Sequence, residues 1–278
     1  MAARRAAADS ADPARRGTPR RDVAVPLWCA QPVHVATASG TTTVMSHGPA
    51  DRCLDLVLVA DGFAPDGQER FARQVRSILT EVLATEPLGR LRGLLNVHRV
   101  DPAPGRPRLT TGFAGDDGRL LLVDQQAALD VAHQHVPGTD VVLVVVDTGR
   151  YGGSGGTVAA TTCHPRAAAL AVHELGHAAF DLADEYGRDG RHPGPAPSRV
   201  NVTLDPDPAR APWADLVGTD GIGCHEGGDG YASGVYRPAA TCRMRSLAAP
   251  FCPVCSREIR RLLLTRRTPT DPGQFHRV

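Results

Sequence analysis

Two histidines and a glutamate near the middle of the chain form a pattern that zinc enzymes use for hydrolysis. His173, Glu174 and His177 belong to the run HELGH. On a helix, residues four apart project from one face, so the two imidazoles can share one tetrahedral Zn²⁺. Glu174 would then lie beside the metal, where its carboxylate can take a proton from the attacking water and pass it to the leaving amine. The pattern predicts a zinc metalloendopeptidase that hydrolyses peptide bonds.

The residues around this motif favour a helix. Pro165 suits the first helical turn, the alanine-rich run after it consists mostly of good helix formers, and Gly187 marks the far side of the segment. We therefore expect the two histidines on one helical face.

Zinc needs a third protein ligand, and the nearest candidates are Asp184 and Glu185. On an unbroken helix Asp184 would lie about 16 Å along the axis from His173, too far to share a metal. The chain must therefore leave the helix near residues 180–182 and fold back. Asp184 is the first choice. Glu185 is the second, and its alternative role is an ion pair with an arginine.

At this point the sequence resembles the immunoglobulin A peptidase family of zinc metallopeptidases, a branch of the metzincin-like zincins. The resemblance runs in order from about Asp51 to Leu264. The matching motifs are LDLVLVADGFA with the amphipathic segment after it, YGGSGG from Tyr151, HELGHAAFDLADEYG from His173, NVTL from Asn201, GVYRP from Gly234, and CRMR with FCPVC from Cys242 to Cys255.

The resemblance implies a zinc ion held by His173, His177 and Asp184. It also implies that Glu174 is the catalytic base and that Met244 belongs to a turn beneath the metal, where a methionine packs without ligating.

Two further positions follow from the resemblance. The family usually has glycine where this chain has Asp181, at the expected break of the helix. Tyr236, in GVYRP, is the expected donor of a hydrogen bond to the oxyanion of the tetrahedral intermediate. Packing alone would explain Tyr236 or Tyr231 equally well.

Strand and helix patterns alternate before the metal-binding motif. We expect an α/β fold, of the α+β zincin-like kind, with a mostly parallel sheet. The expected strands are Cys53 to Ala60, Leu94 to Val100 and Asp140 to Asp147, and the expected helices are Asp66 to about Thr85, Asp124 to Val136 and, at the end, Val254 to Leu264.

The chain is expected to divide into four parts. Residues 1–22 read as a disordered leader, and residues 23–50 as a small β segment in which Val23 to His47 form two or three antiparallel strands. Residues 51–187 would be the upper catalytic subdomain. Residues 188–278 would be an irregular lower subdomain with the cleft loops, the methionine turn and the C-terminal helix.

A glycine-rich loop, Tyr151 to Gly156, precedes an expected edge strand from Thr157 to Thr162. The loop lacks the spacing of phosphate-binding motifs. We expect bare backbone there to let a substrate approach, and the edge strand to pair with an extended peptide. The alternative is a flexible turn.

Composition limits the classes of binding partner that we expect. The net charge of +1 argues against nucleic acid or an acidic membrane recruited by bulk charge. No apolar run approaches the ~18 residues of a membrane helix, and none follows the N-terminal arginines as in a signal peptide. The direct expectation is a cytoplasmic protein; export by another route, or a misplaced start, is the alternative. Peptide or protein substrates are expected, and the oligomeric state is left open.

The chain has 7 cysteines, an odd number. Cys252-Pro-Val-Cys255 could be a redox pair or half of a structural zinc site, but no second CxxC occurs. We favour a disulfide from Cys242 or Cys224 into the final helix, or buried free thiols, and the sequence does not choose between them.

Two rival functions stay open. An inactive binding module would explain the fold, although the HELGH residues are intact. Hydrolysis of small amides or cell-wall peptides would use the same chemistry on another substrate, and substrate choice depends on loops.

Overall fold

A computed structural model describes residues 40–115, 117–195 and 197–266. The expected leader and residues 23–39 of the expected N-terminal β segment lie outside the described residues. Within the described residues, no helix is long and apolar enough to span a membrane.

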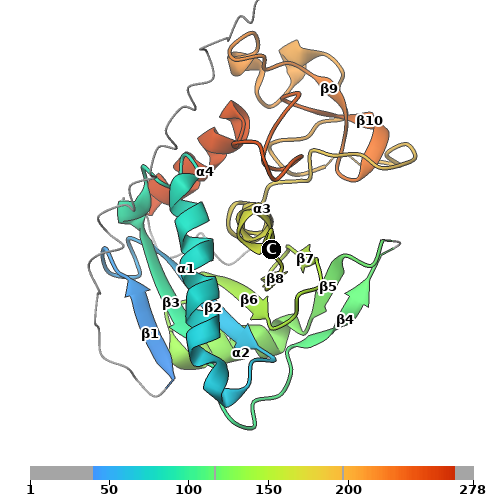
Figure 1. The fold of residues 1–278 in the computed structure, drawn as a ribbon. Coiled ribbons are helices and arrows are strands. Elements are labelled where there is room, and N and C mark those ends of the chain that lie inside the picture. The colour runs from blue at the N-terminus through green and yellow to red at the C-terminus, as the bar shows by residue number, and fades with distance from the viewer. Residues whose placement is uncertain (1–39, 116, 196, 267–278) are drawn as a thin grey trace, which may run out of the picture. The chain divides into compact units, whose positions relative to one another are not determined.

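One eight-stranded sheet forms the base of the fold (Figure 1). Its strands follow the order β1-β3-β2-β6-β8-β7-β5-β4. The four adjacent strands β3, β2, β6 and β8 are parallel to one another, and β1 and β4 run antiparallel to their neighbours at the two edges. The strands are β1 (Thr41–Met45), β2 (Leu54–Asp61), β3 (Leu95–Val100), β4 (Thr110–Ala114), β5 (Leu120–Val123), β6 (Val141–Val146), β7 (Gly153–Ser154) and β8 (Ala159–Thr162).

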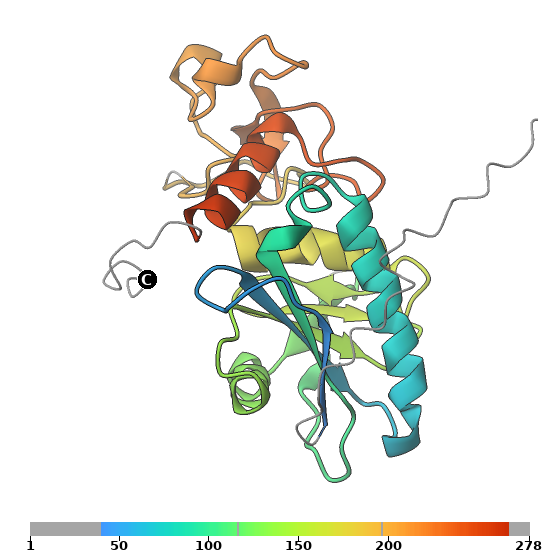
Figure 2. The same cartoon turned by 90° about the vertical axis from the view of Figure 1, so that its left-hand side faces the viewer.

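Helices cover both faces of this sheet, which is why its central strands are continuous apolar runs. Helices α1 (Gln68–Ala84) and α3 (Ala167–Phe180) lie on one face, and α2 (Gln125–His135) lies on the other (Figures 1 and 2). Alternate residues of β2 point to the two layers. Leu54 and Leu56 lie beside residues of α1 and α3, whereas Val57 and Val59 join the cluster that contains α2.

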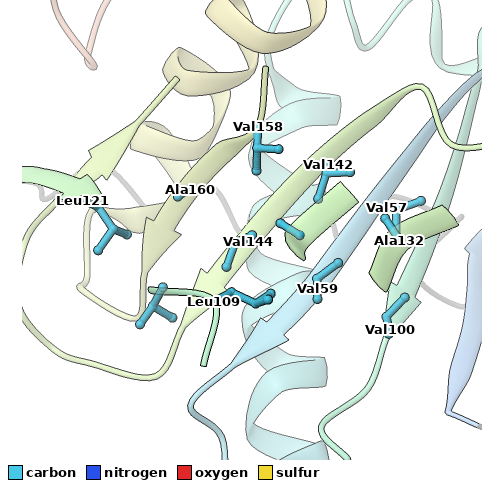
Figure 3. Close-up of a cluster of buried hydrophobic side chains, with 12 residues drawn as sticks. Val57, Val59, Val100, Leu109, Leu121, Ala132, Val142, Val144, Val158 and Ala160 are labelled. Carbon is cyan, nitrogen blue, oxygen red and sulfur yellow. The ribbon is translucent and has the colours of Figure 1, made fainter. Parts of the chain in front are cut away.

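The core on the α2 side is built almost entirely from small aliphatic side chains (Figure 3). Val142 and Val144 of β6 and Ala160 of β8 meet Ala128 and Ala132 of α2, and all five are fully buried. The short side chains allow the helix to approach the sheet closely, so that the sheet forms a rigid base for α3 on its other face.

The C-terminal part is mostly loop, and α3 lies between it and the sheet (Figure 1). It contains a small two-stranded sheet of β9 (His225–Gly228) and β10 (Tyr231–Arg237), followed by helix α4 (Pro253–Thr265). Single turns of 3-10 helix occur at Pro65–Gly67, Arg92–Leu94, Pro208–Arg210 and Ala214–Leu216.

The predicted α/β class with a mostly parallel sheet is confirmed. Each predicted strand and helix between residues 53 and 147 is found, with ends shifted by one or two residues. Of the strands expected within residues 23–47, the described part contains β1, which pairs with β3 at an edge of the main sheet. The hairpin of β4 and β5 was not predicted from the sequence.

The prediction of an edge strand at Thr157 to Thr162 is wrong. β8 pairs with β6 on one side and with β7 on the other. β7 is only two residues long and belongs to the glycine-rich loop, so the loop itself covers the part of β8 that would have been free.

Candidate active site

Helix α3 ends where the sequence predicted a break. Asp181 has left-handed backbone angles, φ 47° and ψ 43°. The N–H of Asp181 donates to the carbonyl oxygen of His177 at 3.0 Å, and the N–H of Leu182 donates to the carbonyl oxygen of Gly176 at 3.1 Å. This C-cap satisfies the last carbonyl groups of the helix and reverses the chain.

The reversal brings Asp184 to the two histidines. Its Oδ1 atom lies 3.1 Å from His173 Nε2 and 3.2 Å from His177 Nε2. The two Nε2 atoms are 3.3 Å apart. Glu185, the second choice from the sequence, points away from the histidines toward a group of cysteines, and its carboxylate forms no ion pair with any arginine in the described residues.

The other ring nitrogen of each histidine faces a backbone carbonyl. His173 Nδ1 is 3.0 Å from the carbonyl oxygen of Arg243, and His177 Nδ1 is 2.6 Å from that of Leu182. A carbonyl only accepts hydrogen bonds, so in each neutral ring Nδ1 carries the hydrogen and Nε2 carries the lone pair. Both lone pairs then point into the space shared with Asp184.

Three acceptor atoms thus meet where no donor from the described part of the chain satisfies them. Asp184 Oδ1 is buried and has no hydrogen-bond partner there when both Nε2 atoms are unprotonated. Burial alone would lower the pKa of His173, but hydrogen bonding to Asp184 and the nearby negative charges raise that pKa to about 9. The site therefore favours a positive charge at its centre, either a proton or a metal ion. His173, His177 and Asp184 are the residues that could hold the metal.

Glu174 lies beside this cluster, deep in the protein. Its side chain is buried, and burial raises its pKa to about 7 against the opposing effect of His173 and His177. A carboxyl group with a pKa near neutrality can both accept and return a proton.

The glycine-rich loop makes room for the side chains of α3. A Cβ atom added at Gly153 would lie 2.9 Å from Glu174 Oε1, and one at Gly155 would lie 2.5 Å from the Cβ of His177. Side chains at these two positions would displace the functional groups of α3. The glycines are needed for this close approach, and the loop also lines the cleft above it.

Met244 lies under α3, as the resemblance implied. It is fully buried, and a Cβ atom added at Gly176, between the two histidines, would come 2.5 Å from its sulfur. The same turn supplies the Arg243 carbonyl group that holds His173, and the Met244 carbonyl accepts the N–H of Glu185 at 2.8 Å. The methionine turn therefore supports both the helix and the segment that carries Asp184.

The structure does not place Tyr236 at the cluster. Tyr236 lies on β10, exchanges backbone hydrogen bonds with Thr203 at 2.7 and 2.9 Å, and is not among the described residues that line the cleft. Its strand belongs to the small sheet of the C-terminal part, away from α3, so the expected oxyanion role lacks support from its position.

Tyr186 is the tyrosine beside the cluster, and the sequence analysis missed it. Its ring stacks on that of His173, with centroids 6.4 Å apart and planes at 21°, and it lies close to the carboxylate of Asp184. Burial and the charge of Asp184 raise the pKa of Tyr186 well above its usual value. Its position next to Glu185, directly after the folding-back segment, was the available signal.

A cleft of about 750 Å³ runs over the cluster. Glycines of the loop, Tyr151 and Tyr186 contribute to its walls, and it is rich in arginine. The arginines are Arg119, Arg166, Arg188, Arg199 and Arg245.

Comparison with known proteins identifies the family of the chain. The family model described as IgA Peptidase M64 matches residues 43–222 and 218–263. These ranges contain α3, Asp184 and the methionine turn. A search of curated proteins gave no match. The match covers well over half of the chain, and M64 peptidases are metallopeptidases. The chain belongs to the IgA peptidase M64 family.

Proposed function

We propose that the protein is a zinc-dependent endopeptidase whose metal ligands are His173, His177 and Asp184. The observation that carries the proposal is the triangle of Nε2, Nε2 and Oδ1 atoms, with sides of 3.1, 3.2 and 3.3 Å. Zinc binds nitrogen and oxygen ligands at about 2.0–2.1 Å, and tetrahedral angles then separate the ligand atoms by about 3.3 Å. The three residues fit this ion, and all three line the cleft.

A bound zinc ion would act as a Lewis acid, polarising the scissile carbonyl group and lowering the pKa of water. Glu174 supplies the base: its carboxylate accepts the proton of the attacking water and returns it to the leaving amine. The backbone carbonyl groups of Arg243 and Leu182 keep the two imidazoles oriented throughout.

Tyr186 replaces Tyr236 as the proposed oxyanion donor. Its ring stacks on His173, it lies close to Asp184 and it lines the cleft, while Tyr236 is outside the cleft lining. We expect Tyr186→Phe to lower kcat by about 10²-fold, as for loss of one oxyanion donor, with metal content unchanged. Tyr236→Phe is the matched control and should leave kcat nearly unchanged. The opposite pattern would restore the assignment made from the sequence.

The substrate is proposed to be a peptide or protein that lies along the arginine-rich cleft. Two rivals stay open, an inactive binding module and a hydrolase of small amides or cell-wall peptides. They differ in outcome, since the first cleaves nothing and the second cleaves short substrates only.

Metal analysis together with digestion of a peptide library tests the proposal. Glu174→Gln keeps the size of the side chain but cannot act as a base, so it should keep the metal and lose about 10²–10⁴-fold in kcat. Glu69→Gln, at a position whose side chain is 80% exposed on α1, is the control and should cleave normally. Unchanged cleavage by Glu174→Gln, or wild-type protein without metal at the histidines, would refute the mechanism.

A further inference from the structure

A second cluster of side chains of types that can bind a metal adjoins the candidate active site. Glu185, Cys242, Cys252 and Cys255 are all buried, and one ligand atom from each lies within 4.8 Å of the others. Cys242 Sγ is 3.7 Å from Cys255 Sγ. Glu185 Oε1 is 3.0 Å from Cys255 Sγ and 3.8 Å from Cys252 Sγ.

Three separate segments build this cluster. Glu185 follows Asp184 after the end of α3, Cys242 precedes the methionine turn, and the other two cysteines open α4. Cys252 is the N-cap of α4 and Cys255 comes three residues later, so both side chains face the same side of the first turn. Cys-x-x-Cys is also the spacing with which many proteins hold zinc.

The carboxylate of Glu185 is the strongest sign that something is bound here. Its side chain is fully buried, and its Oε2 atom has no hydrogen-bond partner in the described residues. The other oxygen accepts from Asn201 Nδ2 at 3.1 Å, and its remaining hydrogen-bond partners are the thiols of Cys255 and Cys252. Within the same described part of the chain no arginine or histidine pairs with the carboxylate. A buried carboxylate among thiols needs a cation or a proton.

The distances match a metal better than a disulfide. Zinc binds thiolate sulfur at about 2.3 Å, so two thiolates of a tetrahedral site lie about 3.8 Å apart. The observed 3.7 Å between Cys242 and Cys255 is close to this value and far above the ~2.05 Å of a disulfide bond. No disulfide is present among the described cysteines.

We propose that Glu185, Cys242, Cys252 and Cys255 bind a second zinc ion, separate from the one at the histidines. Three soft thiolates favour zinc over magnesium or calcium. Four protein ligands in a buried position leave no place for water or substrate, which is the arrangement of a structural zinc site. The ion would tie the start of α4 to the methionine turn and to the residue next to Asp184.

The test counts metals in the purified full-length chain, by elemental analysis, and identifies their ligands by cobalt substitution. The wild type should hold two zinc ions per chain. The double variant His173→Ala, His177→Ala should retain one, and its cobalt form should keep a thiolate-to-cobalt charge-transfer absorption. Because this variant leaves the cysteines intact, the result does not depend on whether a cysteine variant folds.

Cysteine variants complete the assignment. Cys252→Ser should lose one zinc ion and weaken the charge-transfer absorption, whereas Cys53→Ser, at a buried cysteine outside the cluster, should change neither. A histidine double variant that folds but holds no zinc would overturn the proposal. So would an intact mass two hydrogens lighter, with a disulfide mapped to two of the three cysteines.

The same measurements separate this proposal from the catalytic one. If the wild type and the histidine double variant both hold one zinc ion with thiolate ligands, the second site stands and the proposed catalytic site fails. If the wild type holds one zinc ion that the histidine double variant loses, and the cobalt form shows no thiolate absorption, the second site fails alone.

Discussion

The contact between Gly176 and Met244 makes a sharp prediction about stability. A methyl group added at Gly176 would lie 2.5 Å from the sulfur of Met244, 3.1 Å from its Cε and 3.6 Å from Cε1 of Phe251. Carbon atoms in good contact are about 3.5–4.0 Å apart, so the sulfur must retreat by about 1 Å. Met244 is fully buried, so its sulfur cannot move out into solvent.

Two effects oppose each other in Gly176→Ala. Overpacking of a core costs about 1–3 kcal/mol, while alanine favours the helix by about 1 kcal/mol over glycine. We expect a net loss of up to about 2 kcal/mol. In a Met244→Ala background, itself about 2–5 kcal/mol less stable, the space is open and only the helix preference remains. There the same Gly176→Ala change should stabilise the protein by up to about 1 kcal/mol.

A double-mutant cycle measured by urea denaturation tests this reasoning. The four proteins are compared with metal in fixed excess and again with chelator, because bound metal adds to the stability of the folded state. The coupling energy between Gly176 and Met244 should be about 1–3 kcal/mol. Equal effects of Gly176→Ala in both backgrounds would show that the helix does not rest on the methionine.

Further predictions concern the turn, the buried charges and the cleft. Asp181→Val and Asp181→Gly both remove the ion pair with Arg199, but only valine keeps a Cβ atom in the left-handed conformation. The valine variant should therefore be about 1–2 kcal/mol less stable than the glycine variant in thermal unfolding. Equal melting temperatures would contradict this. Without metal the pKa of His173 is raised to about 9, that of Glu174 to about 7 and that of Glu185 to about 8. A group whose pKa is raised by folding contributes its full stabilisation below its pKa in the unfolded chain and loses it as the pH rises through its pKa in the folded protein. Chelator-treated protein should therefore lose stability between about pH 4.5 and 9. The stabilisation gained on adding zinc should grow over the same pH range. Because five arginines line the cleft, we expect added salt to raise KM for acidic peptides more than KM for basic peptides. An equal rise in both KM values would argue against substrate binding along these arginines.

The sequence could predict the parts of the site that depend on local spacing. His173 and His177 share a helical face because of their four-residue separation, and the apolar run of β6 (Val141–Val146) predicts a buried strand. The need for a third ligand also predicted the reversal after α3. The choice of Asp184 over Glu185 rests on long-range contacts, since the two are neighbours and equally acidic.

Other features left no local pattern to read. β7 (Gly153–Ser154) has two residues, too few for any periodicity, yet it turns the expected edge strand into an interior one. Tyr186 stacks on His173 because the chain reverses at Asp181, and such a reversal fixes neighbours that spacing alone does not. The sequence could not predict which residues contact Cys242 for the same reason, because its neighbours in space come from other segments of the chain.

Adjacent residues Asp184 and Glu185 connect the two proposed metal sites. The segment that carries them has no regular hydrogen-bonded structure of its own, and it is held by the Met244 carbonyl and by Asn201. A metal ion bound by Glu185 would restrict this segment and so lower the entropy lost when Asp184 takes its place beside the histidines. Because linkage is reciprocal, each metal would then strengthen the binding of the other. The methionine turn acts on both sites, since Met244 packs against Gly176 of α3 and its carbonyl group accepts the N–H of Glu185, a ligand of the second site.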